Sequence, residues 1–269
     1  MSLTINTNIE AINASRNLNN TENMLSGTMQ RLSSGLRINQ AADDVAGYAI
    51  SQSLQTQVNG LNQAGENIQD AVALAQTAQG ALNDVNTMLQ RVRELDVQYA
   101  NGTTSEEGQK AIKAEAEELV AEIKRVGETT EFNGVKLLDS KKEIAFQVGP
   151  NGGETISITP VELYKSIEEK IKPANLGKEE SFKELTAAIS EVSKVAGTFG
   201  SAQDRIQFTQ SNLETYSQNL TSAVSALDDV NMATEMTNFT KDQVLQQAGV
   251  SILAQANQLP DATLKLLEG

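Results

Sequence analysis

The sequence contains no cysteine, no histidine and no tryptophan among its 269 residues. Without cysteine or histidine, a chain cannot build a serine or cysteine catalytic triad, a thiol nucleophile, or an ordinary zinc, haem or iron–sulfur site. An enzyme of this composition would depend on carboxylate, lysine or tyrosine side chains alone. We therefore expect no enzymatic activity, no metal site and no cofactor.

Positive charge is also scarce, because 21 lysine and arginine residues stand against 35 aspartate and glutamate residues, for a formal net charge of −14. Binding to a nucleic-acid backbone requires a cationic surface, so nucleic acid is not an expected partner. No continuous apolar run of about 18 residues is present, and we expect no insertion into a membrane. The N-terminal residues lack the basic start and apolar block of a signal peptide, which by itself favours the cytoplasm.

Aromatic residues make up only 4% of the chain, and prolines occur only at Pro150, Pro160, Pro173 and Pro260. Because proline interrupts helices, the two long proline-free segments permit unusually long helices. A thin seam of aliphatic side chains along such helices fits this composition better than a large globular core. The composition thus predicts two helical arms around a short insert.

A seven-residue repeat of apolar residues predicts a helix over about residues 45–100. Val58 and Val72 fill alternate positions of this seam, whereas Gly65, Gln79 and Asn86 are weak there. The repeat itself consists of Leu54, Leu61, Ile68, Ala75, Leu82 and Leu89.

Polar residues mark the ends of this helix. We expect Asp43 or Asp44 to cap its start, and Asn101-Gly102 to end it in a left-handed turn. Asp43 and Asp44 could also be read as a catalytic carboxylate pair, but no partner groups accompany them and a helix follows, so a cap is the stronger interpretation. Glycines within 149–153 resemble a phosphate loop only superficially, because no Lys-Ser/Thr follows, and they indicate a hairpin turn.

A second helix is expected over about residues 105–127, folding back on the first, and the C-terminal arm repeats the heptad spacing with Thr209 and Tyr216 between its apolar positions. The predicted fold is mainly α, a long antiparallel helical bundle or coiled coil. The residues that define these two seams are Ile112, Leu119, Ile123 and Val126 in the second helix and Ile206, Leu213, Leu220 and Leu227 in the C-terminal arm.

The insert between the arms has a different pattern. Residues 143–149 and 154–159 alternate apolar and polar side chains around a turn at 150–153, which predicts a small β-hairpin. Residues 161–171 predict one short helix. Such an insert is too small to form an independent domain, so we expect it to pack on the helices.

Both ends of the chain, residues 3–36 and 244–267, carry amphipathic stripes that are low in charge. Neither stripe can be buried alone, because an isolated helix is marginal in water and its apolar face needs a partner. We expect the two ends to pair with each other or with neighbouring subunits, and to become ordered when they do. With the heptad residues of both arms, the predicted assembly seam includes Ile5, Ile9, Ile12, Val244, Ile252 and Leu259.

Five segments resemble regions of the bacterial flagellins. Residues 1–19 (MSLTINTNIEAINASRNLN), 31–51 (RLSSGLRINQAADDVAGYAIS), 89–103 (LQRVRELDVQYANGT) and 130–138 (TEFNGVKLL) are similar to the family's N-terminal region. Residues 201–260, beginning SAQDRIQFTQSNLETYSQNL, are similar to its C-terminal region. The segments lie at both ends and in the family's order, which makes the resemblance specific.

The resemblance implies a structural subunit that is exported and polymerises into the flagellar filament for motility, by coupled folding and assembly of its terminal helices. It implies an inner coiled-coil domain formed by residues 1–40 and 231–269. Residues 41–177 and 178–230 would form a rod domain, with the hairpin insert but without large outer variable domains. Family members leave the cell through the flagellar type III export apparatus without a cleaved signal, so the expected location becomes extracellular.

The resemblance also implies partners besides the homopolymer: an export chaperone at about residues 229–267, the export apparatus, hook–filament junction and cap proteins, and a host Toll-like receptor. For the receptor, Arg91, Leu95 and Glu115 occupy the positions of the binding surface in recognised members. Alternatively, Arg91 and Glu115 are solvated helix charges and Leu95 packs in a seam. Asp96 places a charge where many relatives have a small or apolar residue.

Three other functions were weighed against a filament subunit. A hook–filament junction protein shares similar end regions but has a longer middle. A soluble coiled-coil adaptor would never polymerise. A hydrolase that uses carboxylates alone is the weakest of the three.

Overall fold

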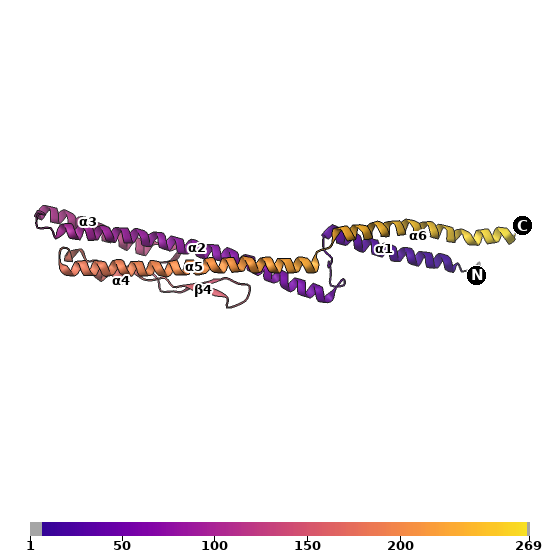
Figure 1. Ribbon diagram of the computed structural model, residues 1–269, viewed down its shortest axis with the longest axis horizontal. Helices are drawn as coiled ribbons and strands as arrows, with labels where there is room; N and C mark the ends of the chain where they lie inside the picture. The colour runs from indigo at the N-terminus through magenta and orange to yellow at the C-terminus, as the bar shows by residue number, and fades with distance from the viewer. Residues whose placement is uncertain (1–6, 268–269) are drawn as a thin grey trace. The chain divides into compact units, whose positions relative to one another are not determined.

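The protein, as seen in a computed structural model that describes residues 7–267 and their side chains up to Gln258, divides into two compact units. We call Met1–Thr56 with Asn219–Gly269 the terminal unit, and Gln57–Gln218 the central unit. The elements run in the order α1 (Ile9–Ser34), α2 (Val45–Tyr99), α3 (Glu106–Thr129), β1 (Glu131–Phe132), β2 (Val135–Lys136), β3 (Ile144–Gln147), β4 (Thr155–Ile158), α4 (Leu163–Ile167), η1 (Glu168–Lys170), η2 (Pro173–Asn175), α5 (Glu179–Asp228) and α6 (Met232–Leu267). The predicted class, mainly α with long helices and a small hairpin, is confirmed (Figure 1).

In the terminal unit, α1 and α6 lie side by side and antiparallel (Figure 1). Two contacts fix their register. Asn8 Nδ2 donates to the carbonyl oxygen of Ala256 at 2.7 Å, and Arg31 Nη1 lies 3.4 Å from Glu235 Oε1. Within one subunit the terminal helices therefore pair with each other, which is one of the two arrangements expected from the sequence.

The side chains buried in the α1–α6 pair are small or polar. Thr21 and Thr28 donate their hydroxyl protons to carbonyl oxygens one turn back in α1, so their burial leaves no unpaired donor. The buried set consists of Ala14, Thr21 and Thr28 of α1 and Glu235, Asp242 and Ala256 of α6. The alanines and threonines of this set are small enough to let the two helices approach closely.

The apolar stripe predicted for the chain ends is divided in this pair. Leu18, Leu25 and Leu32 are half-buried. Ile9, Ile12, Val244 and Ile252 are all exposed, so pairing of α1 with α6 does not bury them. Ile5 and the side chain of Leu259 lie outside the described part of the chain.

An isolated β-bridge joins the segment that follows α1 to the segment that precedes α6. Leu36 bridges Asp229 in antiparallel orientation, and Val230 N donates to the carbonyl oxygen of Gly35 at 3.0 Å. Gly35 ends α1 with a φ of 75°, a left-handed conformation that glycine adopts without strain. The sequence analysis did not identify this cap.

In the central unit, the predicted heptad residues of α2 form the buried seam, and Leu61, Ile68, Ala75, Leu82 and Leu89 are at most 2% exposed. Leu54, which belongs to the terminal unit, is half-buried. Of the predicted alternate row, Val58 is buried, Val72 is only half-buried, and the weak positions Gly65, Gln79 and Asn86 lie at the edge of the seam. From Leu61 onward the chain instead buries the residues three positions after each heptad residue. The buried alternate row is Ala64, Ala71, Ala78, Val85 and Val92.

Helix α5 packs with the same spacing, as residues Leu185, Val192, Phe199 and Ile206 recur every seven positions and are buried. Of the residues predicted for this seam, Leu213 is buried, and Leu220 and Leu227 in the terminal unit are half-buried. Tyr216 is exposed rather than in the seam. The long bundle is therefore held by aliphatic rows at helical spacing, as predicted.

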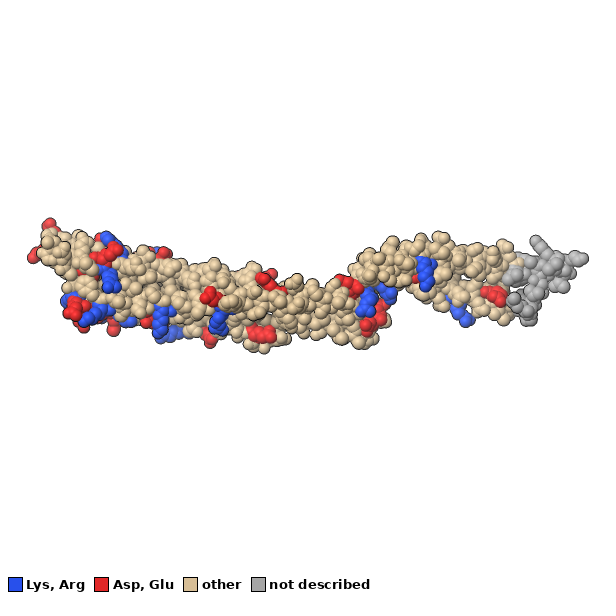
Figure 2. Space-filling view, viewed as in Figure 1, with Lys and Arg blue, Asp and Glu red and all other residues tan. Residues whose placement is uncertain are grey.

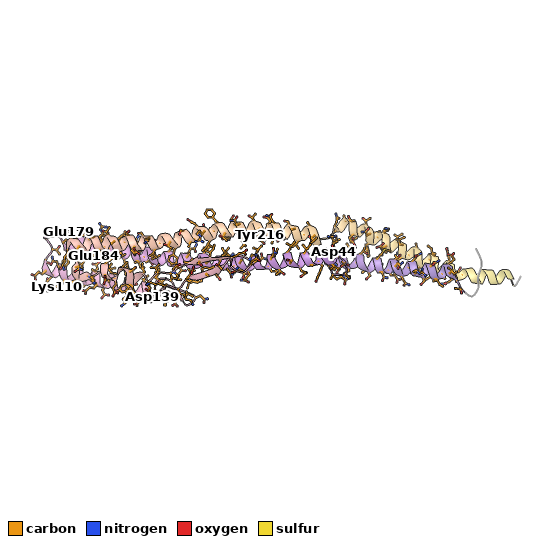
Figure 3. All side chains as sticks on the ribbon, turned by 90° about the horizontal axis from the view of Figure 1, so that it is seen from below. Asp44, Lys110, Asp139, Glu179, Glu184 and Tyr216 are labelled. Carbon is orange, nitrogen blue, oxygen red and sulfur yellow. The ribbon has the colours of Figure 1, made fainter. Side chains whose placement is uncertain are left out.

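The start of α2 is capped as predicted, but its end is not. Asp44 Oδ1 accepts from Gly47 N at 2.9 Å, whereas Asp43 Oδ2 accepts from two backbone amides of the preceding loop (Asp44 is labelled in Figure 3). Asn101 and Gly102 do not adopt the left-handed conformation, which corrects the prediction. Instead Asn101 Oδ1 accepts from Thr103 N, so a side-chain turn replaces the left-handed cap.

The second helix and the insert largely follow the sequence prediction. Ser105 caps α3 by accepting from Gly108 N at 3.2 Å. Strands β3 and β4 pair antiparallel, and the turn between them contains Gly153 at a φ of 92°. The single short helix expected at 161–171 is instead one α-helical turn, α4, continued by the 3-10 turn η1.

The hairpin docks on α2 at a glycine. A side chain at Gly60 would place its Cβ 2.9 Å from Cβ of Pro150, so only glycine lets the turn lie this close to the helix. Asn67 Nδ2 also donates to the carbonyl oxygen of Gln147 at 3.0 Å. These contacts confirm that the insert packs on the helices.

Candidate assembly and recognition surfaces

The α1–α6 pair exposes an unusual number of large apolar side chains, which we call the apolar outer face. Each of them is 44–60% exposed, although the same helices bury Thr21, Thr28, Glu235 and Asp242 between them. Figure 2 shows that charged side chains are sparse over the visible face of this pair. The apolar outer face consists of Ile9, Ile12, Met24, Met29, Met232, Met236, Val244, Leu245, Val250 and Ile252.

In a helical pair in water, the apolar stripe usually faces the partner helix and polar residues face the solvent. The α1–α6 pair half-buries Leu18, Leu25 and Leu32, yet it leaves ten large apolar side chains exposed. Exposed apolar surface of this extent marks an interaction site. The Arg31–Glu235 ion pair aligns the two helices, and a substantial apolar surface remains in contact with water.

A polar cluster surrounds the β-bridge of the terminal unit. Ser51 Oγ donates to Asp228 Oδ2, and the Arg37 guanidinium donates to the carbonyl oxygen of Leu227 at 2.6 Å. Asp228 is buried, and its Oδ1 has no hydrogen-bond partner among the described residues. The sequence analysis missed this cluster, because nothing in the spacing of Arg37, Ser51 and Asp228 brings them together.

Two of the three receptor-binding candidates form an ion pair on the surface of the central unit. Arg91 Nη2 lies 2.8 Å from Glu115 Oε1, and Arg91 Nη1 lies 3.2 Å from Glu94 Oε2. The hydrogen bond with Glu115, and then that with Glu94, raises the pKa of Arg91 above its ordinary value. The side chains of Arg91 and Glu115 are each about half-exposed, so both can be reached from solvent.

The third candidate, Leu95, is not on the surface. It is 1% exposed and packs in a cluster with Ile112, Ala116 and Leu176, with Tyr99 against its edge. This corresponds to the alternative reading of the sequence, in which Leu95 is a packing residue. A direct contact between Leu95 and a receptor has no support in the described subunit.

Asp96 holds the start of α5 rather than disturbing the surface. The side chain is fully buried, its Oδ1 accepts from Gly177 N at 2.6 Å, and its Oδ2 accepts from Ser181 Oγ at 2.8 Å. Gly177 has a φ of 82°, and Tyr99 lies so close that a Cβ at this position would meet its ring at 2.7 Å. Figure 3 labels Glu179, which opens α5 two residues after this contact.

The charge that the sequence places at Asp96 is therefore accommodated inside the central unit. Both carboxylate oxygens are paired with donors from the chain just before and within the first turn of α5, so the buried charge has partners. No spacing in the sequence links residue 96 to residues 177–181. The only sign of this contact in the sequence is that an acidic residue occupies an apolar position of a strongly periodic helix.

The described residues show no arrangement suited to binding a metal ion. Among the described residues, no group of three or more aspartate or glutamate side chains is placed to hold a metal ion, and no helix is long and apolar enough to cross a membrane. Asp43 and Asp44 are used in backbone hydrogen bonds, as described above. The glycines at 149–153 belong to the hairpin turn, where Asn151 N donates to Glu154 Oε2.

The comparisons with known proteins agree with this architecture. The family model "Bacterial flagellin N-terminal helical region" matches residues 5–143, and "Bacterial flagellin C-terminal helical region" matches residues 182–267. The chain is 44% identical to a flagellin of Halalkalibacterium halodurans (98% of this chain, 99% of the relative) and 37% identical to one of Bacillus subtilis (98% and 99%). A "Flagellar filament 33 kDa core protein" of Treponema phagedenis is 35% identical over 98% of this chain and 99% of the relative. The crystal structure of Bacillus cereus flagellin superposes with a TM-score of 0.50 at 27% identity, over 55% of this chain and 88% of that one.

Proposed function

Because the chain belongs to the bacterial flagellin family, a family of structural proteins and not of enzymes, we propose that its apolar outer face is the surface through which subunits assemble into the flagellar filament. The observation that carries this proposal is the exposure of ten large apolar side chains on the α1–α6 pair. The fully buried residues of the pair are small or polar, leucines such as Leu18 and Leu25 are half-buried, and the ten residues of the apolar outer face are 44–60% exposed. A filament of such subunits is an extracellular structure.

The energetics favour burial of this face against neighbours. Covering the exposed half of each of its ten side chains is worth roughly 1 kcal/mol per side chain, or about 10 kcal/mol in all. Association of two proteins costs ~4–15 kcal/mol in lost freedom. The apolar outer face is therefore large enough to drive assembly only when several neighbours cover it together, which couples the final ordering of the ends to polymerisation.

We further infer that residues 1–40 and 231–269 form the inner domain of the subunit, and that residues 41–177 and 178–230 form the rod. The two divisions, 40/41 and 230/231, fall in the non-helical segments between α1 and α2 and between α5 and α6. The compact units divide elsewhere, inside α2 and α5. The proposed domain boundaries thus follow the ends of helices, whereas the compact units divide within helices.

We propose that an export chaperone binds at about residues 229–267, which carry part of the apolar outer face. A free subunit would expose Val244, Leu245 and Ile252 of α6, and a chaperone groove that accepts an amphipathic helix would shield them until assembly. In this proposal, the subunit then passes through the type III export apparatus without a cleaved signal. Outside the cell it contacts the hook–filament junction and cap proteins.

Single charged substitutions test the assembly surface. Ile252→Asp should block polymerisation, because a carboxylate would be buried against a neighbour. Gln255→Asp is the matched control, since it adds the same charge at an exposed polar position of the same helix. Seeded polymerisation observed by electron microscopy is the measurement. Normal filaments of Ile252→Asp would remove the proposed role of this face.

Recognition by a Toll-like receptor is a second proposal, limited to the exposed Arg91 and Glu115 with Glu94 beside them. Leu95 contributes by supporting this patch from beneath. Arg91→Ala should reduce receptor activation in a reporter assay, whereas Arg93→Ala, an exposed neighbour on the same helix, should not. Equal activation by the two variants would end this proposal.

A further inference from the structure

Four of the six methionines lie on the apolar outer face. Met24 and Met29 of α1 and Met232 and Met236 of α6 are each 48–54% exposed. Met88, by contrast, is half-buried in α2 of the central unit. Easily oxidised sulfur is thus concentrated on the surface that the proposed function assigns to assembly.

The four methionines occupy the same end of the α1–α6 pair. The ion pair between Arg31 and Glu235 aligns the two helices there, with Met29 two residues from Arg31 and Met236 next to Glu235. None of the four belongs to the buried set of the pair, which is made of small and polar side chains. Changing their polarity should therefore disturb the packing of α1 on α6 less than it disturbs a contact made with their exposed sides.

The composition makes these sulfurs the natural target of an oxidant. The chain has no cysteine, tryptophan or histidine to compete for a two-electron oxidant such as a peroxide. In the reaction, the thioether sulfur attacks one peroxide oxygen, the O–O bond breaks, and an S=O bond forms. Sulfur loses two electrons, and the leaving hydroxide takes the proton from the oxygen now bound to sulfur and becomes water. The product, methionine sulfoxide, is polar and can be reduced again by methionine sulfoxide reductases.

We propose that Met24, Met29, Met232 and Met236 form an oxidation-sensitive patch through which peroxides block assembly of the free subunit. This inference rests on the proposed function, because the patch matters only if a neighbouring copy of the chain covers it. Burying a sulfoxide oxygen without a hydrogen-bond donor is unfavourable. Each oxidised methionine that a neighbour covers should raise the critical concentration for polymerisation about tenfold. Assembled subunits are protected, because their methionines are covered.

The test compares polymerisation before and after treatment of the purified subunit with hydrogen peroxide. The untreated chain should polymerise, and the oxidised chain should need at least about ten times more protein while keeping its helical circular dichroism. A variant with Met24→Leu, Met29→Leu, Met232→Leu and Met236→Leu should polymerise after peroxide as it does before. Met88→Leu is the matched control and should remain sensitive. Treatment with methionine sulfoxide reductase should restore assembly of the oxidised chain.

A second measurement needs no substitution. Peptide mass spectrometry should find the four methionines oxidised in free subunits and spared in filaments exposed to the same peroxide. Equal oxidation in both states, or unchanged polymerisation of the fully oxidised chain, would overturn the inference. If the untreated chain itself does not polymerise, the proposed function fails instead, so the two failures are distinct.

Discussion

The two units of this protein differ in how far they bury their large apolar side chains. In the central unit, α2 presents Leu61, Ile68, Leu82 and their alternate row to the interior, where they are almost fully covered. In the terminal unit, α1 and α6 cover threonine, alanine, glutamate and aspartate and leave isoleucine and methionine outside. The central unit therefore has an apolar core of its own, and the terminal unit leaves large apolar side chains exposed to water.

The largest expected effect comes from removing one side of the terminal pair. Deletion of residues 1–34, which include α1, should abolish filament formation, because α6 loses its partner and the apolar outer face loses four of its ten residues. Electron microscopy of seeded samples measures the loss. Far-ultraviolet circular dichroism should still report a soluble, helical chain, because the central core is untouched. Filaments from the truncated chain would mean that the central unit alone carries the polymer.

Single truncations of side chains should separate stability from assembly. Leu82→Ala removes a fully buried side chain from the central seam and should lower the free energy of unfolding by about 2–5 kcal/mol. Ile252→Ala, the matched change on the outer face, should alter it by no more than about 0.5 kcal/mol, because that side chain is exposed in the subunit. Denaturant unfolding followed by circular dichroism tests both. A large loss of stability in Ile252→Ala would contradict the contrast between the two units.

A smaller effect is expected at the polar contact inside the central unit. Asp96→Ala leaves Gly177 N and Ser181 Oγ without their acceptor and should lower the free energy of unfolding by about 1–3 kcal/mol. Asp84→Ala, at an exposed position of the same helix, is the control and should be close to neutral. Comparable stability of the two variants would show that the buried carboxylate contributes nothing to the start of α5.

The smallest effect concerns surface charge on the central unit. Lys165, and next Lys141, hydrogen bond to Glu162 and lower the pKa of its carboxyl to about 2. A lowered pKa in the folded state stabilises the protein above the carboxyl's ordinary pKa of 4.5, and this contribution is lost as the pH falls towards 2. Lys165→Ala should raise the pKa of Glu162 towards its ordinary value, which nuclear magnetic resonance titration can follow. Lys172→Ala, an exposed lysine outside this cluster, should leave it unchanged.

The features that the sequence analysis predicted correctly are those set by local periodicity. The heptad of α2 identifies Leu61 to Leu89 because one helix turns the same face inward every seven residues. The second buried row is instead the one that contains Ala64, Ala71 and Ala78, which lies next to the predicted row on the helix. Periodicity alone does not say which of two neighbouring rows a partner helix will cover.

Contacts between distant segments could not be predicted in the same way. Asp96 meets Gly177 and Ser181, and Ser51 meets Asp228, only after α5 has folded back along the chain. For the terminal helices, the sequence identified Ile9 and Ile252 as apolar stripe residues, but the choice between an inward and an outward orientation depends on the packing of Thr21 and Thr28 against α6. Such contacts and orientations depend on the tertiary structure, so the local spacing of residues does not predict them.

The contact between Gly60 and Pro150 also has a consequence for modifying this protein. The hairpin turn is fastened to α2 at Pro150, whereas Gly152 at its tip is exposed and has no neighbouring atom within 4 Å of a side chain that might be added there. Extra sequence introduced at Gly152 would extend away from the helix, while any larger residue at Gly60 would push the whole hairpin off it. A foreign peptide intended for display on the subunit therefore belongs at the tip of this turn, and position 60 must stay glycine to hold it.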